Sequence, residues 1–458
     1  MTVMTYLRSS LPPSFRFGLG AGLLLCTMAT ASAEVRLPAI ISDHMVLQQK
    51  KAVPLWGWAE PGEEITITIA GQKKTTVTPP SGKWMLRLNS IRSGGPYILQ
   101  VKGRNELNIQ DVLVGEVWLG SGQSNMAQPA QEARDFTTTK AESDQPQIRM
   151  FKVEFGGATN ALSDCTGTWK VCSPETIGRF SAVLYFFGRE LHTSLNVPMG
   201  LINSSVGATA IESWIPPAAQ HARPGDGRGD LFNGKIAPLI PYSIAGTIWY
   251  QGEANAKSVE QARLYRDQLP MLIKEWRAHW GDAFPFAWAQ LPNYKERAEG
   301  WCLVREGQLK SLTLPKTGMA ITVDIGDAGN IHPKNKQETA RRLSLWALGT
   351  VYGKKVPSTS GPLPTSQKFR TDEVVLSFSH TDSGLIAKGG ELKGFTIAGN
   401  DRQWLPAQAK LKGNKVIASN PAVKNPIAVR YAWQDNPDCN MFNGAGLPAS
   451  PFRTDDWK

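Results

Sequence analysis

The chain contains few of the residues on which metal, redox and nucleic-acid sites depend. Its 458 residues include six histidines and five cysteines, and the cysteine spacing does not resemble a zinc site. The formal net charge is +11, but no basic block with interleaved aromatic residues occurs, which argues against nucleic acid as a partner. No internal repeat and no low-complexity segment is found, so a repeat architecture is not expected.

Long apolar runs are also scarce, and the one that occurs lies near the start of the chain. Residues 17–28 are apolar, Arg8 and Arg16 precede them without any acidic residue, and an Ala-Ser-Ala cleavage site ends at Ala33. This pattern predicts a secretory signal over residues 1–33, because the run is too short to cross a bilayer comfortably. We expect a secreted or periplasmic protein with no membrane attachment after cleavage, an uncleaved anchor being the alternative. Loss of the two arginines lowers the formal net charge by two, from +11 to +9.

Four cysteines remain beyond the signal, and export would allow them to form disulfides. Cys165 and Cys172 flank a short segment and could pair locally, which would leave Cys302 to pair with Cys439. Free buried thiols are the alternative. The sequence does not decide between the two.

Three regions with different patterns follow the signal. Residues 34–110 alternate apolar and polar residues between Gly, Pro and Ser turns, which predicts a small sandwich-like β domain. Residues 111–352 alternate strand-like apolar runs with helical stretches, which is typical of a three-layer α/β domain with a mainly parallel sheet. Residues 353–458 are again β-rich and rich in loops, and we expect them to pack on the α/β core.

Helix signals support the α/β assignment of the middle region. Three helices are expected, over residues 181–195, 258–280 and 334–351. Ser258 and Gln261 fit a capping box at the start of the second helix, and Pro270 should kink it. Pro333 is expected in the first turn of the third helix, a position that tolerates proline.

Four apolar strand-like runs in this region each lead into a polar or glycine-rich turn. The runs are 112–117, 199–203, 245–250 and 319–323. If these strands are parallel, their turns meet at one edge of the sheet, where open α/β sheets bind their ligands. The first turn carries Ser124 between glycine-rich neighbours, an arrangement that lifts one hydroxyl off the end of a sheet.

Acyl transfer requires a nucleophile, a base and hydrogen-bond donors for the developing oxyanion. Ser124 supplies the nucleophile, and His332 is the best base because it follows a strand and precedes a helix at the expected edge. The backbone N–H groups of Ser124 and Gly207 are candidate oxyanion donors, and the side-chain amide of Gln251 or Asn255 is a third. Each has a structural alternative: a helix cap for the serine, a helix start for the histidine, and loop stabilisation for the amides.

The carboxylate that orients His332 is harder to assign. Asp324 is the first candidate, and Asp327 and Glu253 are alternatives. A serine–histidine dyad, with the imidazole held by a backbone carbonyl, is also open, because aspartates at strand ends often cap helices or form turns. The side chains beside the turns are expected to contact the substrate: Gln123, Asn125, Glu253 and Asn255.

Three separated blocks, in this order, carry a family resemblance. They are Gly-Gln-Ser-Asn-Met at 122–126, Trp-Tyr-Gln-Gly-Glu at 249–253 and Ile-His-Pro at 331–333. Together they resemble the sialate O-acetylesterase family of the SGNH hydrolase superfamily, which is close to carbohydrate esterases that deacetylate xylan. The similarity extends from Ile40 to the C-terminus and includes Asn-Gly at 233–234.

The resemblance implies an SGNH-like α/β core with accessory β domains, no metal and no cofactor. It makes Ser124 the nucleophile and His332 the base, and it places Gly207 and Gln251 at the oxyanion blocks. The chain departs from the wider superfamily at Gly329, where many members have an aspartate three residues before the histidine.

These observations predict a secreted serine esterase that removes O-acetyl groups from sugars, most readily O-acetylated sialic acids. The first alternative is an esterase for acetylxylan or another polysaccharide. A second, of another class, is a non-catalytic carbohydrate-binding protein, for which fifteen tryptophans would suit sugar stacking. A two-carboxylate glycosidase has little support, since the motif turns centre on serine, glutamine and histidine. The pattern assigns no oligomeric state.

Overall fold

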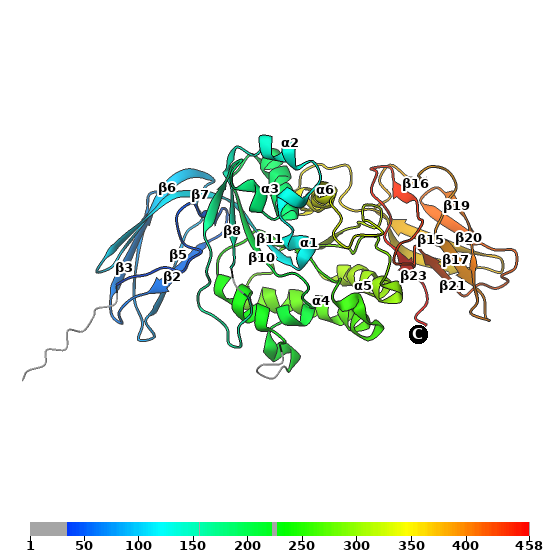
Figure 1. Cartoon of the computed structure of the whole chain (residues 1–458), viewed down its shortest axis with the longest axis horizontal. Coiled ribbons are helices and arrows are strands. Elements are labelled where there is room, and N and C mark those ends of the chain that lie inside the picture. The colour runs from blue at the N-terminus through cyan, green and yellow to red at the C-terminus, as the bar shows by residue number, and fades with distance from the viewer. Residues whose placement is uncertain (1–33, 155, 222–226, 458) are drawn as a thin grey trace, which may run out of the picture. The chain divides into compact units, whose positions relative to one another are not determined.

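The computed structural model describes residues 34–154, 156–221 and 227–457 (Figure 1). The predicted secretory signal, residues 1–33, lies outside the described residues. Within the described ranges no helix has both the length and the apolar character needed to cross a bilayer.

The N-terminal part of the described chain consists of β-strands joined by short turns. They are β1 (Val46–Gln48), β2 (Val53–Trp58), β3 (Glu64–Ile69), β4 (Gln72–Val77), β5 (Lys83–Leu88), β6 (Gly94–Lys102) and β7 (Glu106–Gly122). In β3, Ile65, Ile67 and Ile69 are buried and alternate with more exposed residues, as expected of a strand with one face on a core. β3 pairs antiparallel with β4 and β6, and β2 pairs antiparallel with β5.

Strand β7 connects this β region to the central sheet without a break. Its first half pairs antiparallel with β6, and Glu116–Gly122 pair with strands of the central sheet. The boundary that we predict between residues 110 and 111 therefore falls inside one continuous strand. The division into regions 34–110, 111–352 and 353–458 stays a prediction.

The central sheet is mainly parallel and has the strand order β13-β12-β11-β7-β10-β8-β9. Its further strands are β8 (Gln145–Lys152), β9 (Trp169–Cys172), β10 (Met199–Ser205), β11 (Gly246–Tyr250), β12 (Phe286–Ala289) and β13 (Thr317–Ala320). All neighbouring pairs are parallel except β8–β9. The carboxyl ends of β7, β10, β11 and β13 therefore lie at one edge, where we expect the ligand site.

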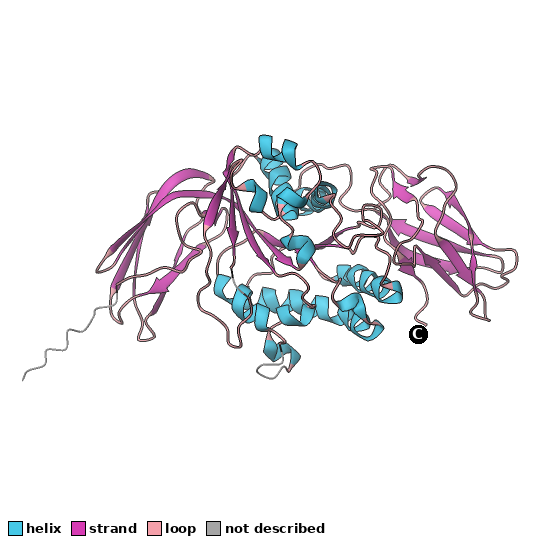
Figure 2. Ribbon diagram, in the orientation of Figure 1, coloured by secondary structure: helices cyan, strands magenta, loops and turns pink. Residues whose placement is uncertain are grey.

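Helices cover both faces of this sheet (Figures 1 and 2). The α-helices are α1 (Ser124–Ala127), α2 (Phe136–Ala141), α3 (Ala182–Leu195), α4 (Val259–Trp280), α5 (Ala298–Lys310) and α6 (Lys336–Trp346). Trp118 of β7 is buried in one core cluster with α3 and α6, while its neighbour Leu119 is buried in another with α4 and α5. Successive strand residues point to opposite faces, so the two clusters lie on opposite sides of the sheet. This confirms the predicted α/β core with a mainly parallel sheet.

The predicted helices are present, with one correction at the third. Ser258 caps α4 by accepting a hydrogen bond from the Gln261 backbone N–H at 3.2 Å, and the helix continues through Pro270. The third helix begins at Lys336 with Asn335 as its cap. Pro333 therefore lies before the helix and not in its first turn, because the Asn335 side chain accepts from the Glu338 backbone N–H and fixes the helix start.

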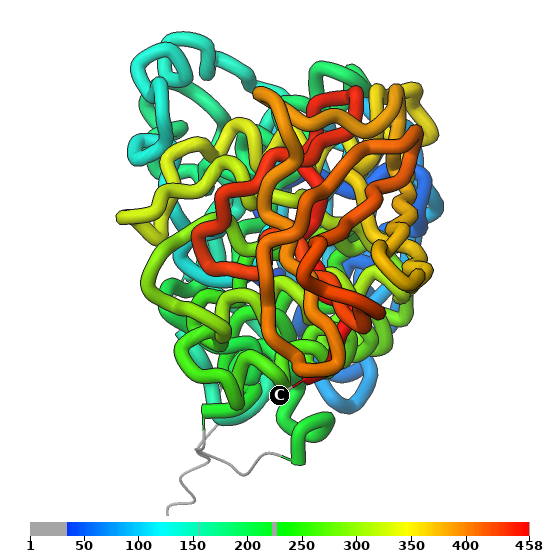
Figure 3. The backbone as a smooth tube through the Cα atoms, turned by 90° about the vertical axis from the view of Figure 1, so that its right-hand side faces the viewer, coloured from blue at the N-terminus to red at the C-terminus, as the bar shows by residue number. Residues whose placement is uncertain are grey.

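The C-terminal part contains two four-stranded antiparallel sheets and a two-stranded one. Its backbone, coloured orange to red, faces the viewer in Figure 3. Its strands are β14 (Leu363–Phe369), β15 (Glu373–Ser379), β16 (Leu385–Ala387), β17 (Phe395–Ala398), β18 (Trp404–Pro406), β19 (Gln408–Lys412), β20 (Lys415–Ser419), β21 (Ala428–Tyr431), β22 (Met441–Asn443) and β23 (Phe452–Arg453). The sheets β14-β15-β20-β19 and β18-β17-β21-β23 share one core cluster. α5 contacts this part through the buried Arg305, which donates to the carbonyls of Gln434 and Asp435.

The four cysteines of the described chain, Cys165, Cys172, Cys302 and Cys439, are free thiols. The two disulfides considered from the sequence are not formed. Burial raises the pKa of Cys165 and of Cys172 to about 12, which makes both weak nucleophiles.

Candidate active site

The serine turn is built where β7 ends against β11. Gly122 has a φ of +131°, and a Cβ atom there would lie 2.2 Å from the carbonyl oxygen of Tyr250, so the position requires glycine. The next residue, Gln123, donates its backbone N–H to the same carbonyl oxygen at 2.9 Å. This turn ends the strand and starts α1 at Ser124, which leaves the serine half-buried at the edge of the sheet.

The structure brings the predicted nucleophile and the predicted base together. His332 lies on the segment between β13 and α6, and its Nε2 is 2.8 Å from Oγ of Ser124. The backbone N–H of His332 donates to the Asn330 side chain at 2.9 Å, which fixes the course of this segment. Residues 208 positions apart thus meet at hydrogen-bond distance, as general-base activation of a serine requires.

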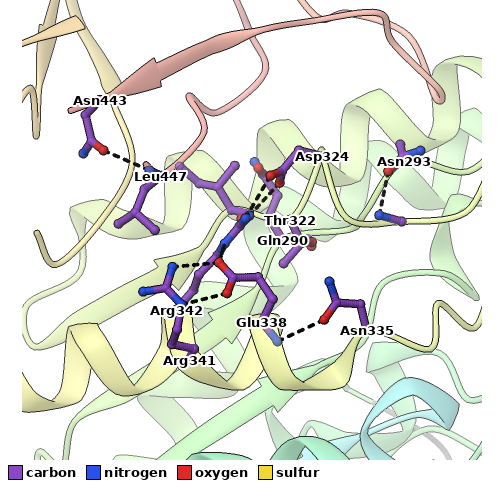
Figure 4. A network of polar contacts seen from close by, with 12 residues as sticks. Gln290, Asn293, Thr322, Asp324, Asn335, Glu338, Arg341, Arg342, Asn443 and Leu447 are labelled. Carbon is purple, nitrogen blue, oxygen red and sulfur yellow. Dashed lines mark hydrogen bonds and ion pairs between the residues drawn. The ribbon is translucent and has the colours of Figure 1, made fainter. Parts of the chain in front are cut away.

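Asp324, our first candidate for the carboxylate behind His332, has a different partner (Figure 4). Its two oxygens accept from Nη1 and Nη2 of Arg342 at 2.6 and 2.8 Å. Arg342 also donates to Glu338 at 2.8 Å and to the carbonyl of Ile321. Asp324 therefore ties the segment after β13 to α6, and the sequence-based assignment of this residue to His332 is not supported.

The two alternative carboxylates also bind elsewhere. Asp327 accepts from the backbone N–H of Gly329 at 2.9 Å, and Glu253 accepts from Nδ2 of Asn125 at 2.6 Å. Within the described part of the chain, Nδ1 of His332 contacts neither a carboxylate nor a backbone carbonyl at hydrogen-bond distance. The geometry is that of a serine–histidine dyad.

Charges near His332 act on the protonation of its imidazole in opposite directions. Burial lowers the pKa of His332, the positive charge of Lys336 lowers it further, and the negative charge of Glu132 raises it. Glu132 is exposed on the 3₁₀-helix Ala130–Glu132, whereas Lys336 is buried. The net lowering of the pKa favours the neutral imidazole, which is the form that accepts a proton from serine.

Two backbone N–H groups are free to bind an oxyanion. A Cβ atom on Gly207 would lie 3.6 Å from Cβ of Ser124, so the turn after β10 approaches the serine closely. Among the described residues, the backbone N–H groups of Ser124 and Gly207 have no hydrogen-bond acceptor. Both predicted backbone donors therefore lie beside the hydroxyl and are unused.

The third predicted donor, Gln251, is occupied. Its Nε2 donates to the carbonyl of Thr209 at 3.0 Å and to Oδ1 of Asn255 at 2.8 Å. Asn255, the alternative donor, gives its own amide to both oxygens of Glu212 at 3.0 and 3.2 Å. These amides hold the turns after β10 and β11 together, so the loop-stabilising interpretation applies to both residues.

The residues expected to contact substrate are buried. Gln123, Asn125 and Glu253 are at most 3% exposed, and Asn255 is fully buried. Gln123 accepts from the backbone N–H of Ala254 at 3.2 Å. These side chains are already buried in contacts with the protein, so direct substrate contact by them is not supported.

Asn125 is the centre of this buried network. Its Nδ2 donates to Glu253 at 2.6 Å and to the carbonyl of Ile331 at 3.0 Å, and its Oδ1 accepts from Nζ of Lys336. The bond to Ile331 connects the residue after the serine to the residue before His332. Burial raises the pKa of Glu253 and lowers the pKa of Lys336 to about 7. Asn125 therefore acts as a positioning residue for the pair.

Lys336 and Glu132 are absent from the sequence-based site. Lys336 occupies the first position of a helix, where the helix dipole disfavours a cation, and this unfavourable placement is a signal that could have singled it out. Nothing local marks Glu132, because its effect on His332 depends on how the chain folds. In the described ranges no three His, Cys, Asp or Glu side chains cluster so that they could share a metal ion.

Comparison with known proteins assigns the chain to a family. Residues 114–345 match the model of the carbohydrate esterase, sialic acid-specific acetylesterase family. The chain is 30% identical to the sialate O-acetylesterase of Homo sapiens over 508 residues, covering 96% of each, and 30% identical to that of Mus musculus, covering 94% of this chain and 97% of the other. The crystal structure of XAC1771, a carbohydrate acetylesterase from Xanthomonas citri, is 40% identical and superimposes with a TM-score of 0.89, covering 93% of this chain and 100% of the other. The chain therefore belongs to the carbohydrate esterase family of sialic acid-specific acetylesterases and is a carboxylic ester hydrolase.

Proposed function

We propose that this protein is a serine esterase that removes O-acetyl groups from sugars through Ser124 and His332. The observation that carries the proposal is the 2.8 Å contact between Oγ of Ser124 and Nε2 of His332, beside two free backbone N–H groups. A serine hydroxyl is a weak nucleophile, and a neutral imidazole within hydrogen-bond distance is what activates it.

In the acylation step, Oγ attacks the acetyl carbonyl carbon as Nε2 of His332 takes the hydroxyl proton. The carbonyl oxygen becomes an oxyanion, which the N–H groups of Ser124 and Gly207 stabilise. The bond between the acetyl carbon and the sugar oxygen then breaks, and Nε2 returns its proton to that oxygen. The products of this step are the free sugar hydroxyl and an acetyl ester on Ser124.

In the deacylation step, water attacks the acetyl ester and His332 takes one of its protons. The second tetrahedral intermediate uses the same two N–H groups. Its collapse breaks the bond to Oγ, returns the proton to Ser124 and releases acetate. No carboxylate of the described chain orients His332. Asn125 instead donates to the backbone carbonyl of Ile331, the residue before His332, and this bond supports the position of the imidazole.

The proposed substrates are O-acetylated sialic acids, which the family model and the relatives named above support. The second candidate is an acetylated neutral polysaccharide, favoured by the tryptophan-lined groove described below. Acetate release from acetylated sialic acid and from acetylated xylan, measured side by side, separates the two. The signal-like residues 1–33 further support a secreted or periplasmic location, which is also a proposal.

Replacement of the nucleophile tests the chemistry. We expect Ser124→Ala to lower kcat on an aryl acetate by roughly 10⁴-fold or more, with unchanged thermal unfolding. Ser205→Ala is the matched control, since Ser205 ends the neighbouring strand β10 and its hydroxyl donates to Asn203. Retained activity in Ser124→Ala would refute the proposal, and equal losses in both variants would point to a general disturbance of the sheet edge.

A further inference from the structure

Three tryptophans of the C-terminal part lie outside the core. Ten of the chain's fifteen tryptophans are buried and five are half-buried, and three of these five, Trp404, Trp433 and Trp457, belong to the C-terminal part. All three line a cavity of about 540 Å³, a volume in the range of small-ligand sites. A second cavity of about 490 Å³ shares Trp404, Trp433, Arg430 and Gln434 with the first. We call the two cavities together the tryptophan groove.

Ring–ring and cation–π contacts hold the aromatic rings of the groove in place. The rings of Trp404 and Trp457 are 5.2 Å apart, centroid to centroid, at 47°. The Arg430 guanidinium lies 4.2 Å from the Trp404 ring, and the Arg402 guanidinium lies 5.2 Å from the Trp457 ring. Cation–π contacts of this kind fix the orientation of a partly exposed ring before any ligand arrives.

The charges that line the groove are balanced. Lys393, Arg402 and Arg430 line it together with Glu299, Asp435 and Asp438, which makes three charged side chains of each sign. Arg430 also donates two hydrogen bonds to Asp455, a carboxylate outside the lining, at 2.7 and 2.8 Å, so the groove has no free excess of positive charge. A groove without an excess of positive charge does not select an anionic ligand. It offers both hydrogen-bond donors and acceptors around apolar ring faces.

This combination fits the chemistry of a neutral sugar. One face of a pyranose ring carries C–H groups that pack on an indole, while the hydroxyls at its edge donate to carboxylates and accept from guanidinium groups. Trp and Arg are also the residues that contribute most to binding when they lie in a partly enclosed site. The ten core tryptophans, by contrast, are buried and present no ring face to a ligand.

The groove adjoins the segments that lead to His332. Asp435, in its lining, accepts the backbone N–H groups of Glu296, Arg297 and Ala298 at 2.8 to 3.0 Å. The neighbouring Lys295 donates its backbone N–H to the carbonyl of Ala328 at 3.1 Å, four residues before the histidine. The loops after β12 and β13 therefore connect the groove to the edge of the sheet that carries Ser124.

From this arrangement we infer that the tryptophan groove binds an oligosaccharide of neutral pyranose units, at a site separate from Ser124. The site goes beyond the esterase chemistry proposed above. It holds a stretch of sugar chain next to the catalytic edge, by which we mean the edge of the central sheet that carries Ser124 and His332. The bound stretch need not be acetylated.

Calorimetric titration of the full-length Ser124→Ala protein tests the inference without turnover. The neutral probes are cellohexaose and xylohexaose, and 3′-sialyllactose is the negatively charged probe for comparison. We expect the neutral probes to bind, and Trp404→Ala or Trp457→Ala in the same background to weaken that binding by about tenfold or more. Trp58→Ala is the matched control, because Trp58 is also half-buried and stacks with an arginine, Arg36 at 4.5 Å, but lies on β2.

The titration has three results that would overturn the inference. They are no binding of either neutral probe, binding of the sialylated probe alone, and binding that the Trp404 and Trp457 variants leave unchanged. Thermal unfolding is measured for every variant. If the alanine variant at position 457 unfolds, Trp457→Phe replaces it, because it keeps an aromatic ring there. We expect it to weaken binding of the neutral probes less than the alanine variant would. Because no activity is read, failure of the esterase proposal would leave these results unaffected.

Discussion

The catalytic edge and the tryptophan groove are built in opposite ways. At the edge, the half-buried side chains of Ser124 and His332 adjoin a buried hydrogen-bond network. In this network Asn125 binds Glu253 and Lys336. In the groove, the large side chains are themselves half-exposed, and their charges are balanced at the surface. A reaction depends on fixed positions of a few atoms, which buried hydrogen bonds supply, whereas sugar binding depends on accessible ring faces.

This comparison implies that the edge is sensitive to changes in residues that a substrate never touches. The most severe test is Lys336→Met, which keeps the length of the side chain and removes its charge. It leaves Oδ1 of Asn125 buried without its donor and removes the cation near Glu253. We expect the free energy of unfolding to fall by about 3 kcal/mol, because a buried acceptor loses a charged donor.

The same variant should move the pH profile of the esterase. The charge of Lys336 lowers the pKa of His332, so its removal raises that pKa. The imidazole then stays protonated up to a higher pH, and the acid limb of kcat/KM moves to higher pH. Lys334→Met removes a charge from an exposed position two residues earlier and serves as control. A Lys336→Met protein with unchanged stability and an unchanged acid limb would contradict the role of the network.

Asp324→Asn tests the other side of the comparison, a carboxylate that supports structure and not chemistry. The substitution removes the charge that faces Arg342, whose side chain is 5% exposed. We expect a loss of about 1 to 3 kcal/mol in the free energy of unfolding, with kcat of the folded enzyme within about tenfold of the parent. A loss of about 10⁴ in kcat at unchanged stability would instead make Asp324 the missing third member of a triad. Asp327→Asn, at an exposed turn, is the control.

Much of the fold follows from local patterns. The run at 64–69 alternates apolar and polar residues and forms β3 over those same residues. The cap at Ser258 and the first residues of α4 lie where the sequence predicts them. The sequence pattern does not predict α5, because residues 298–310 carry two glycines and the helix is buried by contacts with α4 that sequence periodicity does not reveal.

The candidate site, too, can be predicted from the sequence only in part. Ser124, Gly207 and His332 could be predicted, since each lies in a turn after a strand and a parallel sheet brings such turns together. The partners of Asp324 and Gln251 could not be predicted. They depend on which buried donor or acceptor is closest in the folded chain, and a residue type at a strand end is compatible with several partners. The sequence therefore predicts which residues meet at the edge of the sheet better than it predicts the hydrogen bonds that hold them there.

The smallest expected effect comes from Glu132, an exposed residue that acts on the edge through its charge alone. Its carboxylate raises the pKa of His332, so Glu132→Gln lowers that pKa and moves the acid limb of kcat/KM to lower pH, opposite in direction to Lys336→Met. The shift should be a fraction of a pH unit and should shrink as salt is added, because solvent-exposed charges are screened over about 10 Å at 0.1 M ionic strength. Asp135→Asn removes a nearby exposed charge as the control. No shift at low salt would show that the imidazole does not sense the charge at Glu132 and that its protonation is set by the buried network alone, and a shift to higher pH would contradict the direction of the effect.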